Sequence, residues 1–327
     1  MKGFLVMVLA MVSLVVFPAN ERRGMIQMRK INGVVIESSI NSFTDTAKIK
    51  LPKNVKEFAN KQLNQLIRRN DEVIISLGYG TDLKKEFKGY VTEVSPEIPI
   101  VITCKDEMFK LMQLPVNVSY RNVQLKTLLM DILPLKAIDA LEIQLGQVRY
   151  AKTTVGEVLE KLKSDYNLIT YWKNNTVVCG KVFSANKQNV KYGFETNIKV
   201  SNLVFKNKED VLIKLNATST LIGGTKIEVT VGDEDGQQRN LSYFNIKTKP
   251  ELKVLAEQDL DKFKYTGFSG DFNSFGIPYV EIGWVADLQS KESPEKNGKY
   301  LIESVVTTFD DSPQFDRKIT IERKTEV

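Results

Sequence analysis

The sequence predicts a β-rich α+β fold in which two similar small antiparallel β-barrels flank an inserted α+β domain. Three observations predict it: short strand-like segments recur before residue 113, helical periodicity marks the middle of the chain, and strand patterns return after residue 200. A length of 327 residues fits two or three domains of ordinary size. We therefore expect a leader at 1–24, a first β-barrel at 25–113, an inserted α+β domain at 114–200 and a second β-barrel region at 201–327.

The first segment has the composition of a leader. One lysine precedes an apolar run from Phe4 to Phe17, which is shorter than the ~20 residues that cross a bilayer and has the length of a signal-peptide core. The cleavage signal is poor, because Phe17 rather than a small residue stands two before Ala19. Met25 and Met28 are alternative starts if the chain is extended upstream in error. Under both interpretations, residues 1–24 are expected to lie outside the fold.

The first barrel is expected from a series of strand-like stretches at residues 30–51, 71–77, 86–94 and 98–104. In them, apolar residues alternate with polar ones, as in half-buried strands. Pro52 interrupts the series, and residues 55–69 then place apolar side chains at three- and four-residue steps. That spacing predicts a short amphipathic helix, or a loop with a helical turn, whose basic side chains form a solvated face.

The inserted domain is expected from two helix signals. Leucine and isoleucine residues between 125 and 133 line one face of a helix that stops before Pro134. Thr154 and Glu157 have the spacing of a capping box, in which each side chain satisfies a free amide at a helix start. The expected strands are at 141–145, 168–172 and 176–179, the last two joined as a hairpin.

The second barrel region is expected from a further series of strands with one short helix at 255–263. A weak internal echo links this region with the first. Residues 88–104 and 298–322 both run from a glycine through a tyrosine-bearing strand and a polar break to a final strand. Two copies of one barrel would leave this pattern. The expected strands are at 202–205, 211–217, 226–231, 239–246, 280–284, 300–309 and 317–322.

The composition excludes several kinds of chemistry. The chain has no histidine, which removes Ser-His-Asp and Cys-His nucleophile systems, most catalytic zinc sites and every histidine base. Two cysteines exclude a disulfide scaffold and a four-cysteine zinc site. We interpret Cys104 and Cys179 as buried, inert thiols, with a disulfide between them left open for an exported protein. A net charge of +6, from 46 basic and 40 acidic residues, is well short of a dedicated nucleic-acid binder.

The remaining candidate motifs favour structural roles. Asp233-Glu234-Asp235-Gly236 resembles part of a calcium loop but lacks the later ligands, so a polar hairpin tip is expected. The carboxylate pairs Asp310/Asp311 and Asp259/Asp261 are expected in solvated turns. The glycines at 223–224 and 267–270 lack the Gly-Lys-Ser/Thr of a phosphate loop. We therefore expect no enzyme activity, no cofactor, and no catalytic, cofactor-binding or metal-binding residues.

Six segments carry a family resemblance through their order. They are TDTAKIKLP at 44–52, DEVIISLGY at 71–79, EFKGYV at 86–91, IVITCKDEM at 100–108, GIPYV at 276–280 and GKYLI at 298–302. In this order they resemble the baseplate hub proteins of contractile-tailed phages, the late control protein D type. EFKGYV is similar to the F-x-G-x-V strand of the first hub barrel. The last two segments resemble parts of the second barrel.

The resemblance implies a structural function. Hub proteins of this family form homotrimers, and type VI secretion spike proteins use a related hub. Three copies of two barrels make a near-sixfold ring that joins the sixfold tail tube to the threefold spike. DNA or tape-measure protein passes through the central lumen without specific nucleic-acid binding. The chain is then expected in the tail baseplate of a phage or prophage particle, assembled in the host bacterial cytoplasm.

Two other hypotheses remain. The leader favours an exported β-rich binding protein or adhesin, which predicts a mature N-terminus near Asn20. The carboxylate pairs allow a hydrolase, which predicts glycan cleavage that is lost when Asp259 or Asp310 becomes Asn.

Overall fold

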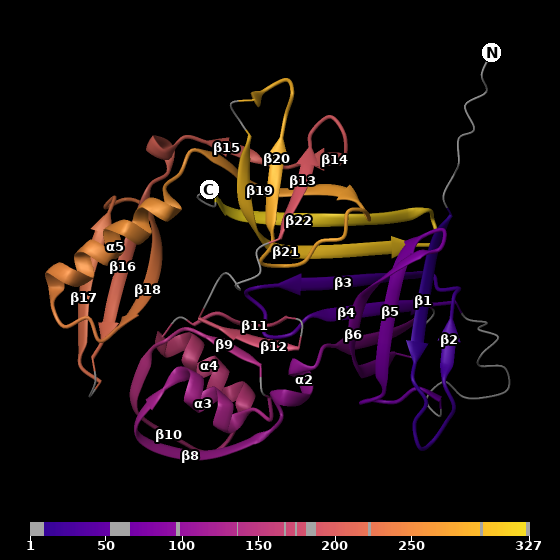
Figure 1. Ribbon diagram of the computed structural model, residues 1–327, viewed down its shortest axis with the longest axis horizontal. Helices are drawn as coiled ribbons and strands as arrows, with labels where there is room; N and C mark the ends of the chain where they lie inside the picture. The colour runs from indigo at the N-terminus through magenta and orange to yellow at the C-terminus, as the bar shows by residue number, and fades with distance from the viewer. Residues whose placement is uncertain are drawn as a thin grey trace.

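The chain is β-rich and built around one large sheet (Figure 1). The computed structural model describes residues 10–52, 66–95, 99–135, 137–166, 168–173, 175–180, 188–221, 224–294 and 297–324. Most of the helix expected at 55–69 lies outside these residues. No helix in the described ranges is long and apolar enough to span a membrane.

The main sheet has 14 strands and contains strands from both ends of the chain. Along its path they are β14 (Ile198–Ser201), β19 (Gly267–Phe275), β22 (Gln314–Lys324), β21 (Gly298–Asp310), β3 (Gly33–Ser39), β4 (Thr46–Leu51), β7 (Ile100–Lys105), β6 (Asp82–Ser95), β5 (Glu72–Tyr79), β1 (Met11–Phe17) and β2 (Ile26–Met28). Beside this path lie β13 (Asn189–Gly193), β15 (Val204–Lys206) and β20 (Val285–Gln289). The strands expected in two barrels thus form one open path in the described residues.

The sheet consists of an N-terminal half (β1–β7) and a C-terminal half (β13–β15 and β19–β22). The halves meet where β21 pairs antiparallel with β3, for example Val306 with Glu37. Each half has its own apolar core on the same face of the sheet. Ile49 and Val73 are fully buried in the first core, and Phe272 and Tyr300 in the second. The backbone is therefore continuous across the two halves, and the apolar packing is largely divided, with Phe309 and Phe315 of the C-terminal half packed in the first core.

Part of the segment expected as a leader belongs to the main sheet. Strand β1 pairs antiparallel with β5 and with β2, and Val15 and Phe17 are fully buried in the N-terminal core. The expectation that residues 1–24 lie outside the fold is therefore wrong for the described part of that segment. The physical reason is the period-two alternation of Ser13, Val15 and Phe17, which a uniformly apolar run hides in the sequence. Cleavage near Asn20 would remove β1 from β5.

A buried carboxylate fastens the turn that follows β1. Asp71, 5% exposed, lies just before β5 and accepts hydrogen bonds from Asn20, Arg22 and Arg23. Arg23 also donates to the carbonyl oxygens of Phe17, Pro18, Gly24 and Leu66. A guanidinium with five donors suits a turn that leaves several carbonyls without strand partners.

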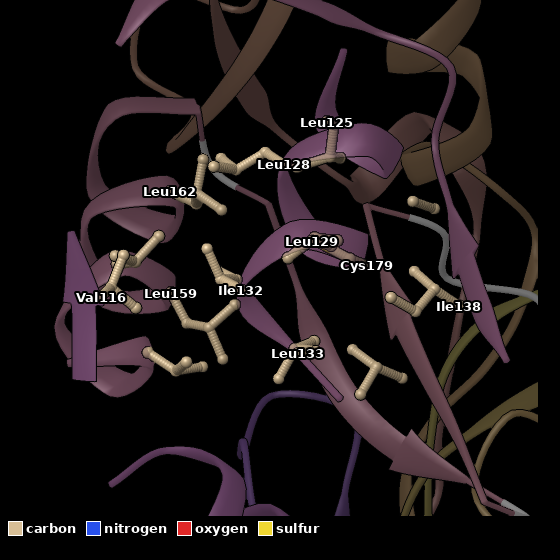
Figure 2. Packing of buried hydrophobic residues seen from close by; sticks show 14 of the residues in the cluster. Val116, Leu125, Leu128, Leu129, Ile132, Leu133, Ile138, Leu159, Leu162 and Cys179 are labelled. Atoms are coloured by element: carbon tan, nitrogen blue, oxygen red, sulfur yellow. The ribbon is translucent and has the colours of Figure 1, made fainter. Parts of the chain in front are cut away.

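The chain between β7 and β13 forms a separate unit, which we call the inserted unit (residues 106–180). It contains α2 (Met108–Leu111), β8 (Pro115–Gln124), α3 (Leu125–Ile132), β9 (Ile138–Ala140), β10 (Gln144–Thr154), α4 (Val155–Tyr166), β11 (Thr170–Lys173) and β12 (Thr176–Cys179). Leucines of α3 and α4, among them Leu129 and Leu159, pack with Cys179 of β12 in an apolar interior (Figure 2). The expected domain extended to residue 200, but β13 and β14, for which no strand was expected, belong to the main sheet.

Local signals in the inserted unit are confirmed. Glu157 donates its amide to Thr154 Oγ1 (3.3 Å), and Thr154 donates its amide to Glu157 Oε2 (2.9 Å), so the capping box starts α4. The hairpin of β11 and β12 is present. The strand expected at 141–145 is displaced, because β9 ends at Ala140 and β10 begins at Gln144.

A second small unit, the α5 unit, interrupts the C-terminal half. It contains β16 (Ile213–Thr220), β17 (Lys226–Gly232), β18 (Gln237–Phe244) and α5 (Lys249–Phe263). Its strands, expected in the second barrel region, form their own three-stranded sheet. Leu215 and Ala217 pack against Leu252 and Ala256 of the helix. Helix α5 is longer than expected and starts at Thr248, whose hydroxyl accepts from the Glu251 amide.

The two segments of the internal echo occupy similar positions. Residues 88–104 form the antiparallel neighbours β6 and β7, and residues 298–322 form the antiparallel neighbours β21 and β22. The strand expected at 280–284 begins instead at Val285, because the residues before it form a loop.

Candidate functional site

The two cysteines are free and buried. Burial raises the pKa of Cys104 to about 12 and that of Cys179 to about 11, and Thr170 lies 3.1 Å from the Cys179 sulfur. Both thiols therefore stay protonated near neutral pH. This agrees with the interpretation of inert core residues.

The calcium-like segment is a tight connection and no hairpin. Strands β17 and β18 lie on opposite sides of β16, so residues 233–236 cross the end of β16. Asp233 accepts from the Ile213 amide (2.9 Å) and from Lys264 (2.7 Å), which lowers its pKa. A Cβ on Gly236 would lie 2.5 Å from the Ile213 backbone, so this close approach requires glycine. No group of three or more potential metal ligands occurs among the described residues.

The carboxylate pairs stabilise local structure. Asp310 accepts from the amide and hydroxyl of Ser312 (3.0 and 2.9 Å) in the turn between β21 and β22, which lowers its pKa. In the α5 unit, Tyr243 donates to Asp259 (2.6 Å), and Asp261 pairs with Lys208 (2.9 Å). The two pairs lie in different units, and each of these three carboxylates has a structural partner.

The main sheet has a broad polar surface, the polar face, on the side opposite to its two cores. Side chains alternate between the faces of a strand, so registers identify its members. One row runs Lys318, Val306, Glu37, Thr46, Lys105 and Tyr90 across β22, β21, β3, β4, β7 and β6. A second row runs Asp316, Thr308, Val35, Lys48 and Thr103. Glu37, Lys48 and Lys318 are exposed.

Three lysines on the polar face pair with carboxylates of other strands of the sheet. Lys318 lies 3.4 Å from Asp271, Lys88 lies 3.2 Å from Glu72, and Lys199 lies 2.7 Å from Asp316. Exposed pairs of this kind add about 0–1 kcal/mol each to stability. Their larger effect is to cancel charge, because these three lysines each have a carboxylate beside them.

A charged cleft of about 340 Å³, the junction cleft, lies where the two halves and the inserted unit meet. Arg317 of β22 and Glu86 of β6 have side chains 1% and 3% exposed and form two hydrogen bonds of 2.6 and 2.9 Å. Arg317 also donates to Thr307 Oγ1 (2.8 Å) and the Gly276 carbonyl oxygen (2.9 Å). Burial raises the pKa of Glu86, although the bonds from Arg317 oppose that rise.

The inserted unit contributes its own cation to the junction cleft. Lys173 of β11 is 9% exposed and donates to the Ile282 carbonyl oxygen at 3.0 Å. Burial lowers the pKa of Lys173, and the nearby Glu281 carboxylate opposes that change. Tyr279 donates to Glu281 at 2.8 Å. The loop before β20 is thus tied to the inserted unit through polar groups.

Sequence reasoning identified neither the polar face nor the junction cleft. The signal for Arg317 was present, because it shares its strand parity with Phe315, Ile319 and Ile321, which face the core. A charged residue on the buried face of a strand indicates a buried ionic partner.

The comparisons agree with the sequence resemblance. No protein-family model and no curated protein sequence matches the chain. Among solved structures, the 43 kDa tail protein of prophage MuSo2 from Shewanella oneidensis has a TM-score of 0.61 at 15% identity, with 95% of this chain and 98% of that chain covered. The tail protein from Neisseria meningitidis MC58 has a TM-score of 0.63 at 11% identity, with 97% of each chain covered.

A secretion protein has a similar fold. The E. coli c3393 protein, a component of the type VI secretion system, has a TM-score of 0.57 at 10% identity, with 91% of this chain and 74% of that chain covered. At such identities the likeness shows the fold. The expected resemblance to baseplate hub proteins is therefore confirmed as a likeness of fold to phage tail and type VI secretion proteins.

Proposed function

We propose that this chain is a structural, non-enzymatic hub subunit in the tail baseplate of a phage or related contractile injection particle. The observation that carries the proposal is a fold shared over nearly the whole length of two tail proteins. The side chains considered for chemistry support it, because Cys104, Asp259 and Asp310 all have structural environments.

The two halves of the main sheet would supply the two barrel-like modules of the hub. The proposed modules are residues 25–113, extended by β1, and residues 201–327 without the α5 unit, with residues 114–200 between them. Three copies would then place six similar modules in a ring between a sixfold tube and a threefold spike. The two cores support this view, because most buried side chains of each half pack around a separate interior.

The polar face is suited to line the lumen of such a ring. A surface that passes DNA must not hold it, and affinity for a phosphate backbone grows with the number of unpaired lysines and arginines. On this face Lys88, Lys199 and Lys318 are paired with carboxylates. The same surface would let a tape-measure protein pass, because a face of mainly polar side chains offers little apolar area for that protein to bind.

The oligomer and its partners test the proposed function. The full chain should form a trimer by mass measurement, and it should co-purify with the tail tube and spike proteins encoded beside it. A strict monomer that associates with neither partner would contradict the proposal. Particles isolated after induction should contain the chain in the baseplate.

The charge pairing tests the role of the polar face. Neutralising three of its carboxylates with Glu72→Gln, Asp271→Asn and Asp316→Asn should increase binding to duplex DNA and make it more salt-dependent. A control with Glu160→Gln, Asp235→Asn and Glu257→Gln changes the net charge equally but lies on α4, the turn after β17 and α5. Equal DNA binding by both triple variants would contradict the assignment of the polar face to the lumen. The hub proposal would not be affected and is tested by the mass measurement.

A further inference from the structure

The α5 unit has a long and regular strand at one edge of its sheet. The strand order β17-β16-β18 leaves the outer side of β17 without a strand partner among the described residues. Figure 1 shows β17 on the side of the unit that lies away from the main sheet. The strand has seven residues, and its register with β16 is unbroken from Lys226 to Gly232. Its outer edge is therefore a continuous line of backbone groups.

Edge strands outside the α5 unit are short or irregular in the part of the chain that the structure describes. On the main sheet, β2 and β15 have three residues each, β13 has five, and β14 has four with a bulge between Ile198 and Val200. In the inserted unit, β9 and β11 have three and four residues, and the pairing of β8 with β10 has three register shifts. Such features keep sheet edges from pairing with other chains, and β17 has neither of them.

Hydrogen bonds at the two ends of β17 show where its backbone groups point. The Leu221 amide donates to the Thr225 carbonyl oxygen (2.8 Å), and the Asp233 amide donates to the Ile213 carbonyl oxygen (2.8 Å). Bonded and non-bonded residue pairs alternate along an antiparallel ladder, so every second residue between these two bonds directs its amide and carbonyl away from β16. The outward-pointing residues are Lys226, Glu228 and Thr230.

The side chains of β17 indicate which kind of strand would pair with it. Ile227 and Val229 pack against the core of the α5 unit but are only half-buried, so apolar side chains of another strand can cover them further. On the opposite face, Lys226 and Glu228 are exposed. Charged residues at an edge disfavour indiscriminate pairing. Two opposite charges on one face favour a strand that carries the opposite charges at the facing positions.

We propose that β17 binds an extended segment of a partner protein, which adds a fourth, antiparallel strand to the sheet of the α5 unit. The segment alternates apolar with polar residues and places an acidic residue opposite Lys226 and a basic residue opposite Glu228. Main-chain hydrogen bonds supply the affinity in this mode of recognition, and the alternate side chains supply the specificity. The proposal goes beyond the hub function and does not depend on it.

A designed peptide tests the edge directly. The probe is a fluorescently labelled synthetic peptide that alternates valine with polar residues and has glutamate opposite Lys226 and lysine opposite Glu228. Fluorescence anisotropy should show that the full chain binds this peptide more tightly than a control peptide of the same composition with its valines grouped together. The control cannot present its valines on one face of a strand.

A matched pair of variants separates the backbone of β17 from its side chains. Glu228→Pro removes an outward amide and no hydrogen bond to β16, whereas Glu228→Ala removes the same side chain and keeps the amide. The proline variant should bind the probe about tenfold more weakly than the alanine variant. Thr230→Pro and Thr230→Ala form the second pair if Glu228→Pro does not fold, since both lose the hydroxyl that donates to Asn216 (3.0 Å).

Three results would overturn the proposal. The first is no binding of the alternating peptide by the wild-type chain, and the second is equal affinity of the folded proline and alanine variants. The third is an association between copies of the chain, measured by sedimentation, that Glu228→Pro abolishes and Glu228→Ala keeps. That third result would assign the edge to a second copy of this chain in place of a partner protein.

Discussion

The inserted unit has an apolar interior and packs Tyr171 and Val178 into the C-terminal core, whereas the cleft between it and the main sheet is lined with charges. Leu128, Leu129 and Leu159 are fully buried among other apolar side chains (Figure 2). In the junction cleft the buried groups are Arg317, Glu86, Asp106 and Lys173. Apolar packing is non-directional and insensitive to pH, whereas buried ionic contacts depend on partner geometry and on protonation. The interiors should therefore resist changes of pH that alter how the units are held together.

Strand β1 contributes buried apolar side chains, and the turn after it contributes ionic contacts. Removal of both should therefore have the largest effect. A chain that starts at Met25 loses the buried Val15 and Phe17 and leaves Asp71 without Arg22 and Arg23. We expect it to lose cooperative thermal unfolding of the N-terminal half, measured by circular dichroism. Deletion of residues 1–9 alone keeps every described contact of β1 and serves as the control. Equal melting temperatures for the Met25 chain and the full chain would contradict the assignment of β1 to the fold.

Breaking the buried ion pair should have the next largest effect. Glu86→Gln leaves the Arg317 guanidinium, whose side chain is 1% exposed, without its compensating charge. The expected loss is about 3–5 kcal/mol in the free energy of unfolding, measured by denaturant titration. Glu72→Gln removes an exposed partner of Lys88 and should cost less than about 1 kcal/mol. Similar losses for both variants would mean that burial does not distinguish these pairs.

A cavity in the inserted unit tests the apolar side of the comparison. Leu159→Ala should lower the free energy of unfolding by about 2–5 kcal/mol, because the fully buried side chain leaves a void. The loss should be the same on both sides of neutral pH, since the described contacts of this leucine are apolar. A loss that changes with pH would show that interior and junction are energetically coupled.

The tie between Lys173 and the loop before β20 should have the smallest effect of the four. Lys173→Met keeps an apolar stem but removes the hydrogen bond to the Ile282 carbonyl oxygen. A hydrogen bond from a charged donor contributes about 1.5–3 kcal/mol. Hydrogen exchange should rise in residues 276–284 and in β11, while α3 and α4 remain protected. Loss of protection throughout the inserted unit would instead assign Lys173 to its interior.

Most of the local structure could be predicted from the sequence. The capping box of Thr154 and Glu157 and the hairpin of β11 and β12 depend on residues near one another in the chain, and both formed as expected. The α5 unit was missed, because its strands have the same alternation as those of the main sheet. Alternation reports that one face of a strand is buried and does not report which sheet the strand joins.

The sequence by itself determined the β-rich character, the helices of the inserted unit and the absence of any group with an ordinary side-chain pKa near 7. These follow from periodicity, capping residues and composition, which are local properties of the chain. Only the tertiary structure decided that β1 belongs to the sheet, that β21 and β3 join its two halves, and that Arg317 meets Glu86. Such contacts link residues far apart in the chain, and their energies depend on burial and geometry that no single segment contains.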